Sequence, residues 1–357
     1  MTRATDAVKT RHLNMLADYR DGLYRQPQLR QLFFELTMRC NERCLHCGSR
    51  CGDVSSEELG AEVYRDLIDK VKRDFSPLPM LCITGGEPLL RKEIYDIMGY
   101  ASSQGFVWGM TTNGTLIDDT AAGKLYDAGM KTVSVSVDGL EASHDAFRRT
   151  PGGYRAAIEG VKALAKHSFN HIQVTTVVTH KTIGELDALF EIMLELPVRS
   201  WRVINLEPIG RARSLEGYML TPDDYVKMFT FIRDKRREGY PVEYGCSHYL
   251  GLSFEREVRN WYFICSAGIY TASILANGDI AACLDIERRP ETIQGNVLRD
   301  DFTQVWKDRF GLFRQPLSEK NEKCSKCASA RFCAGGAHHS WDYDENRPLV
   351  CFDGVLF

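Results

Sequence analysis

The chain has 357 residues, enough for one large domain and a smaller one, and its 44% hydrophobic content is that of an ordinary soluble globular protein. Its formal net charge of -3 provides no global basic field, so we expect neither nucleic acid nor an anionic membrane as a partner. Because there is no signal-peptide pattern and no apolar stretch of membrane-spanning length, we expect a cytoplasmic protein.

The cysteine content points to metal binding rather than to disulfides. Twelve cysteines in a chain without a secretion signal would stay reduced, and clustered thiols in a reducing compartment more often bind metal. Cys82 is different, because it lies in the apolar run 80–84 and is expected to be a buried core thiol.

Residues 1–30 are predicted to form a helical lead-in, since apolar side chains recur there at helical spacing. From about residue 31, apolar β-branched segments alternate with amphipathic ones. Strand-then-helix units in series predict a parallel sheet that is covered on both faces. The predicted strands are 33–36, 80–84, 107–112, 133–137, 172–179 and 201–206. The first helix of this region is predicted to follow a capping box at Ser55 to Glu58. Further helices are predicted at 93–103, 118–128, 154–167, 183–195 and 222–238.

The pattern changes after about residue 240. Seven cysteines lie between positions 246 and 351, among short strand-like pieces such as 270–275. A loop-rich region of this size buries little core, so metal centres are expected to hold it together. We therefore predict three parts: the lead-in 1–30, an α/β domain over 31–240, and a small cysteine-rich domain over 241–357.

Three cysteines near the first predicted strand form the strongest motif. Cys40, Cys44 and Cys47 have three and then two residues between them. Such a loop can wrap three thiolates around a [4Fe–4S] cluster and leave one iron without a protein ligand, open to a small molecule. A zinc site is the alternative, with Cys51 as a fourth ligand.

Three further motifs follow the ends of later predicted strands, at 85–88 (Gly-Gly-Glu-Pro), 112–114 (Thr-Asn-Gly) and 136–139 (Ser-Val-Asp-Gly). With the cysteine loop, they resemble the radical S-adenosylmethionine (SAM) superfamily over about residues 31–240. The resemblance implies a partial (β/α)6 TIM-like barrel with the catalytic cysteines at its mouth, holding a SAM-binding [4Fe–4S] cluster. It further implies that one electron cleaves SAM to a 5′-deoxyadenosyl radical, which takes a hydrogen atom from substrate.

The same resemblance assigns roles around SAM to the strand-end motifs. Gly85 and Gly86 lack side chains, so that backbone can approach the SAM amino group, and Glu87 adds an acceptor nearby. The ribose hydroxyls and the carboxylate of SAM are expected near the polar side chains of Asn113, Ser136 and Asp138.

An arginine is also expected to hold the SAM carboxylate. The run 144–149 resembles a family segment with that role, and it offers two candidates, Arg148 and Arg149. Each of them could instead be a charge on a helix surface, and the sequence does not choose between the two.

The C-terminal cysteines resemble the SPASM extension, which carries auxiliary iron–sulfur clusters, over about residues 246–351. The resemblance implies one or two auxiliary clusters. One cluster would be held by Cys324, Cys327, Cys333 and Cys351, and the other by Cys246, Cys265 and Cys283. The alternative is a zinc ribbon built from the first of these two sets.

This chain departs from the family pattern at Ala337, where another cysteine is expected four positions after Cys333. That cysteine would complete the second auxiliary set. His338 or His339 could replace it, because imidazole can substitute for thiolate on iron. Otherwise the cluster keeps an open iron, or it is smaller or absent.

A second departure lies beside Cys283. Sulfatase-maturing relatives carry an aspartate base directly after the matching cysteine, whereas this chain has Leu284 there and Asp285 one position later. In an extended segment, that one-residue shift turns the carboxylate to the opposite face. A sulfatase-maturing activity is therefore not supported, and Asp285 is either a catalytic base or a turn carboxylate, of which we favour the second.

The family resemblance predicts an enzyme that modifies a peptide or protein side chain, by crosslinking or oxidation. The substrate would be a ribosomally made precursor, bound by the barrel or by a separate leader-binding protein. The reductant would be a flavodoxin or a ferredoxin. Two alternatives stay open: a radical SAM enzyme for a small cofactor precursor such as a tetrapyrrole or quinone, and a non-catalytic zinc or iron–sulfur protein.

Overall fold

The computed structural model describes residues 3–53, 57–245 and 248–357. Its strands are β1 (Gln31–Glu35), β2 (Met80–Thr84), β3 (Trp108–Thr112), β4 (Thr132–Ser136), β5 (His171–Val178), β6 (Ser200–Asn205), β7 (Val242–Tyr244), β8 (Thr271–Ile274), β9 (Asp279–Ala281), β10 (Ile293–Asn296), β11 (Trp341–Asp342) and β12 (Arg347–Pro348). Its α-helices are α1 (Arg3–Arg25), α2 (Ala61–Asp74), α3 (Ile94–Ser103), α4 (Asp119–Asp127), α5 (Glu141–Arg148), α6 (Gly153–Leu164), α7 (Leu186–Glu195), α8 (Pro222–Arg237), α9 (Gly251–Phe254), α10 (Phe302–Asp308), α11 (Glu322–Lys326) and α12 (Ala330–Cys333).

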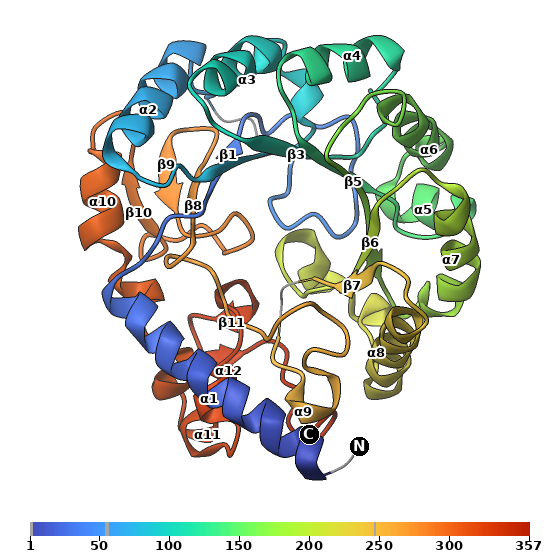
Figure 1. The fold of residues 1–357 in the computed structure, drawn as a ribbon, viewed down its shortest axis with the longest axis vertical. Coiled ribbons are helices and arrows are strands. Elements are labelled where there is room, and N and C mark those ends of the chain that lie inside the picture. The colour runs from blue at the N-terminus through green and yellow to red at the C-terminus, as the bar shows by residue number, and fades with distance from the viewer. Residues whose placement is uncertain (1–2, 54–56, 246–247) are drawn as a thin grey trace.

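The strands β1 to β6 pair in chain order, all parallel, and helices cover their outer side (Figure 1). Side chains alternate across this curved sheet, as the pleat requires. On β1, Leu32 and Phe34 are fully buried on the helix side, where Phe34 contacts Tyr64 of α2, whereas Phe33 and Glu35 line a central cavity. The predicted partial barrel of six β/α units is confirmed.

The sheet continues beyond the six predicted strands at both edges. The strand β7 adds to β6, and β8 adds to β1 in parallel, with Gln31 opposite Thr271. The strands β9 and β10 follow β8 in antiparallel order, which makes one ten-stranded sheet. The cysteine-rich region after residue 240 therefore builds on the barrel through shared backbone hydrogen bonds, and β1 is an interior strand with neighbours on both sides.

The first helix lies along the C-terminal region (Figure 1). Lys9 donates to the carbonyl of Leu252 at 2.8 Å and pairs with Glu257 at 2.9 Å, while Arg20 donates to the carbonyl of Arg331 at 3.0 Å. No helix within the described ranges is both long and apolar enough to cross a membrane.

One helix start was predicted wrongly. The capping box was expected to open a helix at Ser55 to Glu58, but Ser55 and Ser56 lie outside the described residues, and α2 begins only at Ala61, after an N-cap at Gly60 that has no side-chain cap bond. Glu58 instead forms an ion pair with Arg39 at 3.1 Å and bonds Thr37. The carboxylate thus ties the cysteine loop to the chain before α2.

Candidate active site

The three thiols of the cysteine loop line one cavity of about 730 Å³ inside the barrel mouth. Backbone amides already point at two of the sulfurs: Glu42 N donates to Cys40 Sγ and Cys51 N donates to Cys47 Sγ, each at 3.4 Å. Other predicted site residues share the same wall, so the structure brings most of the proposed set together. They are Gly85, Gly86, Asn113, Ser136 and Arg148.

Two glycines let the cysteine loop pack directly on the end of β2. A Cβ on Gly85, whose φ is +144°, would lie 2.4 Å from the carbonyl oxygen of Thr37, and one on Gly86 would lie 2.0 Å from that of Arg39. The amide of Gly86 donates to Thr37 O at 2.8 Å, and the amide of Glu87 donates to Arg39 O at 2.9 Å. The missing side chains thus make room for this chain's own backbone, and both glycines still face the cavity.

Glu87 is placed away from the cavity. Its carboxylate is fully buried and accepts hydrogen bonds from the Thr112 hydroxyl at 2.9 Å, from Asn113 N at 2.9 Å and from Leu89 N at 3.2 Å. Burial raises the pKa of Glu87 to about 7, although these donors oppose the rise. Glu87 therefore ties the ends of β2 and β3 together and is not a free acceptor in the cavity.

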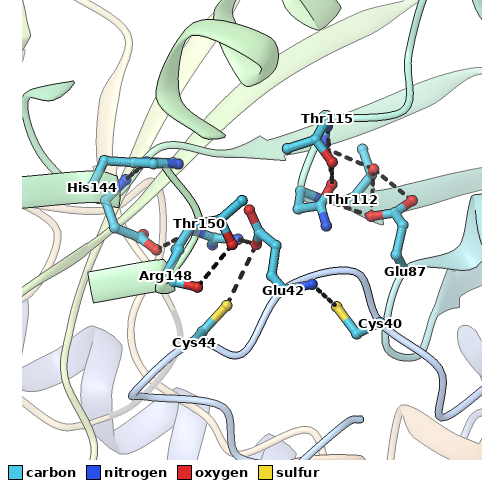
Figure 2. Close-up of polar contacts among 12 residues, drawn as sticks. Cys40, Glu42, Cys44, Glu87, Thr112, Thr115, His144, Arg148 and Thr150 are labelled. Carbon is cyan, nitrogen blue, oxygen red and sulfur yellow. Dashed lines mark hydrogen bonds and ion pairs between the residues drawn. The ribbon is translucent and has the colours of Figure 1, made fainter. Parts of the chain in front are cut away.

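Arg148 lies at the centre of a buried charge network. Its Nη1 donates to Glu42 Oε2 and its Nε to Asp138 Oδ2, both at 2.7 Å (the Glu42 contact is drawn in Figure 2). The same Glu42 oxygen accepts from Cys44 Sγ at 3.4 Å. Arg149 is exposed and adopts a left-handed conformation at φ 53°, which turns it out of the site. The structure thus separates the two arginines that the sequence left equal.

The network keeps Asp138 ionised inside the protein. Burial opposes its charge, but Arg148, with a smaller contribution from the Val177 amide, holds the pKa of Asp138 below its ordinary value. His46 stacks on Phe147 at 4.5 Å, and burial lowers its pKa to about 4, so its ring is neutral at pH 7. Asp138 therefore orients Arg148 and does not itself line the cavity.

The donor set fits an iron–sulfur cluster. Burial raises the pKa of Cys40 to about 11 and also raises that of Cys44, whereas a hydrogen bond from Cys51 lowers the pKa of Cys47 to about 6. Three thiols on one loop, two of them disfavoured as free thiolates, suit a polynuclear cationic centre whose irons replace the protons. Within the described residues, no three His, Cys, Asp or Glu side chains come together closely enough to hold a single metal ion.

Asn113 and Ser136 occupy two other strand ends of the cavity wall. Asn113 donates from Nδ2 to Asn41 Oδ1 at 2.9 Å, and its own oxygen accepts from the backbone and hydroxyl of Thr115. Its side chain is therefore engaged with the cysteine loop, while Ser136 presents a hydroxyl to the cavity.

Four C-terminal cysteines gather around a second cavity of about 290 Å³. Aromatic and aliphatic side chains, including Phe352, share its wall, as does His248. The cysteines that line it are Cys324, Cys327, Cys333 and Cys351, the set that the sequence analysis grouped together.

The other auxiliary set is only partly described, because Cys246 lies outside the described residues. Cys283 lines the main cavity, together with Asp285, and Cys265 lies at a small neighbouring cavity. The cysteine loop follows the carboxyl end of β1, whereas Cys265 precedes the amino end of the neighbouring parallel strand β8, so the two lie toward opposite ends of these strands.

His338, one of the residues after Ala337, is buried, and its Nδ1 contacts Tyr343 Oη at 2.9 Å. Burial lowers the pKa of His338 to about 3. Burial likewise raises the pKa of Tyr343, and the charges of Cys265 and Cys283 raise it further. The buried His338 ring is therefore hydrogen-bonded to a tyrosine hydroxyl.

Sequence reasoning missed three residues of the site. Glu42 and His46 lie inside the cysteine motif, but only their burial in the fold shows that they contact Arg148 and Asp138. A charged residue between cluster ligands was the one available signal. Arg211, far away in sequence, donates to the carbonyl of Cys44 at 2.8 Å and had no signal at all.

Two family profiles match the chain: the Radical SAM superfamily over residues 34–193 and SPASM, an iron-sulfur cluster-binding domain, over residues 265–328. An AdoMet-dependent heme synthase of Methanosarcina barkeri is 28% identical over 346 residues, covering 90% of this chain and 96% of that protein. The mycofactocin maturase MftC of Mycobacterium ulcerans is 30% identical over 313 residues, covering 85% of this chain and 82% of that protein.

Solved structures share the fold. The structure of anSMEcpe with bound AdoMet gives a TM-score of 0.71 at 21% identity, covering 88% of this chain and 90% of that one. Streptococcus suis SuiB bound to S-adenosylmethionine gives 0.69 at 19% identity, covering 88% and 74%. The expected fold class and the family resemblance are confirmed.

Proposed function

The chain belongs to the radical SAM superfamily and carries a SPASM domain, and from this premise we propose that it modifies a side chain of a peptide or protein substrate. It binds a [4Fe–4S] cluster and SAM in the barrel, and auxiliary iron–sulfur clusters in the SPASM domain. When bound, the cluster and SAM supply a one-electron reductive cleavage whose product takes a hydrogen atom from substrate.

The observation that carries the proposal is the continuity of the main cavity. One space of about 730 Å³ is lined at the barrel mouth by Cys40, Cys44 and Cys47, and elsewhere by Cys283 of the SPASM domain. Its size is that of a typical ligand site. Tyr262 adds an aromatic wall. A substrate residue held in this space would lie between the initiating cluster and an auxiliary one.

Within this proposal the chain's own residues bind and orient. Cys40, Cys44 and Cys47 hold the initiating cluster. Arg148 holds the SAM carboxylate, because it lines the cavity and is fixed by two carboxylates, while the exposed Arg149 has no part. Ser136, Asn113 and the Gly85–Gly86 backbone complete the SAM wall, and Glu87 and Asp138 act by positioning their neighbours.

The SPASM cysteines are assigned on the same terms. One cluster is held by the four cysteines of the second cavity, and another by Cys265 and Cys283 together with Cys246. We also propose that the reductant is a flavodoxin or ferredoxin, that a separate protein binds the leader, and that the enzyme is cytoplasmic. The mycofactocin maturases among the relatives support a peptide substrate.

A second candidate function is action on a tetrapyrrole. Two observations favour it: the heme synthase relative is matched over nearly its whole length, and Arg202 and Arg259 line the main cavity, where they could bind carboxylates. Another relative is named Fe-coproporphyrin III synthase.

One experiment distinguishes the two. The reconstituted, reduced enzyme is incubated anaerobically with SAM and either iron coproporphyrin III or a precursor peptide encoded beside the gene, and products are read by mass spectrometry. A mass change confined to the peptide supports the proposal, and one confined to the tetrapyrrole replaces it. No 5′-deoxyadenosine with either substrate would refute both functions.

A further inference from the structure

Cys51 packs directly against the last cysteine of the loop. It is 2% exposed and lines the main cavity. Its backbone amide donates to Cys47 Sγ at 3.4 Å, and Cys47 packs against the small buried cluster to which Cys51 and Met38 belong. The Cys51 sulfur also lies 3.9 Å from the thioether of Met38. One residue thus places an amide donor on a cluster-binding sulfur and a thiol close beside it.

The surrounding chain holds Cys51 in this position. Gly52 N donates to Met38 O at 2.8 Å, and Arg211 Nη1 donates to the Cys51 carbonyl at 3.2 Å. Gly52 has a φ of +83°, a left-handed conformation that favours glycine, so glycine lets the chain fold back here. The contact to Cys47 is therefore built into the loop rather than left to a free side chain.

We propose that Cys51 is a positioning residue of the initiating cluster: its amide and its thiol both donate to the Cys47 sulfur and thereby raise the cluster's reduction potential. Reduction adds negative charge to the cluster sulfurs, and hydrogen bonds to those sulfurs favour the reduced state. The thiol proton can be donated to the Met38 thioether or to the Cys47 sulfur. An iron-bound thiolate is a far better hydrogen-bond acceptor than a neutral thioether. Burial strengthens the bond, because no water competes.

The inference rests on Cys47 as a cluster ligand, which belongs to the proposed function, but not on the identity of the substrate. It also differs from the zinc alternative, in which Cys51 is itself a ligand. If Cys51 bound the fourth iron, no open iron would remain for SAM. The two roles therefore predict opposite responses to SAM in the unaltered enzyme.

The test is a redox titration of the reconstituted full-length enzyme, followed by electron paramagnetic resonance. The initiating cluster is recognised by the change in its signal when SAM is added, which separates it from the auxiliary clusters. The variants are Cys51→Ala and Cys51→Ser, and the control is Cys82→Ala, which removes a β2 thiol that does not line the cavity.

We expect Cys51→Ala to keep its iron and to lower the ratio of reduced to oxidised initiating cluster at a fixed potential by about threefold, the effect of one weak hydrogen bond. At 59 mV per tenfold for one electron, this is a fall of about 30 mV. Cys51→Ser keeps a hydroxyl donor and should recover most of the potential, and Cys82→Ala should not shift it.

Three results would overturn the proposal. One is an unchanged potential in Cys51→Ala. Another is loss of the initiating cluster in both Cys51 variants, which would make Cys51 a ligand or a structural residue. The third is an unaltered enzyme whose signal ignores SAM while that of Cys51→Ala responds. If neither the parent protein nor any variant cleaves SAM, the proposed function itself fails. That failure is read from SAM cleavage and is separate from the shift in reduction potential.

Discussion

Replacing Arg148 by methionine should lower the free energy of unfolding by about 3–5 kcal/mol, the usual cost of removing one partner from a buried ion pair. The side chains of Glu42 and Asp138 are 1% and 0% exposed, and both would lose their cation. His46 would not replace it, because its ring is neutral at pH 7. One Glu42 oxygen has no hydrogen-bond partner even with Arg148 in place, so the loss of Arg148 leaves this carboxylate still less compensated.

The deficit should depend on pH with a definite sign. In the parent protein the lowered pKa of Asp138 keeps it ionised from about pH 5 to 8, so its stabilising contribution is lost only at more acid pH, as the pH falls through that pKa. Without Arg148, burial dominates and raises the pKa of Asp138, so the folded variant takes up a proton more readily. The stability difference between parent and variant should therefore shrink toward pH 5 and grow toward pH 8.

The measurement is guanidinium unfolding followed by circular dichroism, under argon, on iron-loaded protein at several pH values. The matched control is Arg149→Met, the same chemical change one residue later on an exposed side chain, which should cost less than about 0.5 kcal/mol. Arg148→Lys should lie between the two, because an ammonium lacks the planar fork that reaches both carboxylates. Equal losses for Arg148→Met and Arg149→Met, or a deficit that does not vary with pH, would refute the reasoning.

Three further outcomes are expected. Gly86→Ala should displace the cysteine loop, because its Cβ would lie 2.0 Å from a backbone oxygen, and should abolish 5′-deoxyadenosine formation while the auxiliary iron remains. The control Gly99→Ala, in an open helical position, should be neutral or slightly stabilising. Equal 5′-deoxyadenosine formation by the two variants would contradict this. Cys44→Ala should also abolish 5′-deoxyadenosine, measured by chromatography, and residual product would show that this loop is not the initiator. Because the pKa of Glu87 is raised to about 7 in the folded protein, protonation of this carboxyl stabilises the fold at low pH, and the stabilisation is lost as the pH rises through 7. The free energy of unfolding of the parent, measured in urea, should therefore fall by up to about 1 kcal/mol per pH unit between pH 5 and 7 relative to that of Glu87→Gln. Parallel pH profiles of the two proteins would rule this out.

The regular part of the fold could be read from local pattern. The strand predicted over 80–84 is β2 (Met80–Thr84), and the helix predicted over 222–238 is α8 (Pro222–Arg237), because alternating and helical periodicities are properties of neighbouring residues. The start of α2 was wrong because the carboxylate of Glu58 found a distant partner, Arg39, in place of a helix N-terminus. The pairing of β8 with β1 had no local signal, since it joins segments 240 positions apart.

The sequence by itself determined the family, the barrel and the three thiols of the loop, because spacing within one loop and motifs at strand ends are local and survive any detail of packing. Only the tertiary structure decided how those motifs are used. It put Arg148 in the cavity wall and left Arg149 exposed, since α5 ends between them and the left-handed residue turns away. It turned Glu87 into a tie between strands and placed Cys51 on the Cys47 sulfur. Burial, side-chain direction and long-range contacts decide such roles, and none of these is encoded in the spacing of a motif.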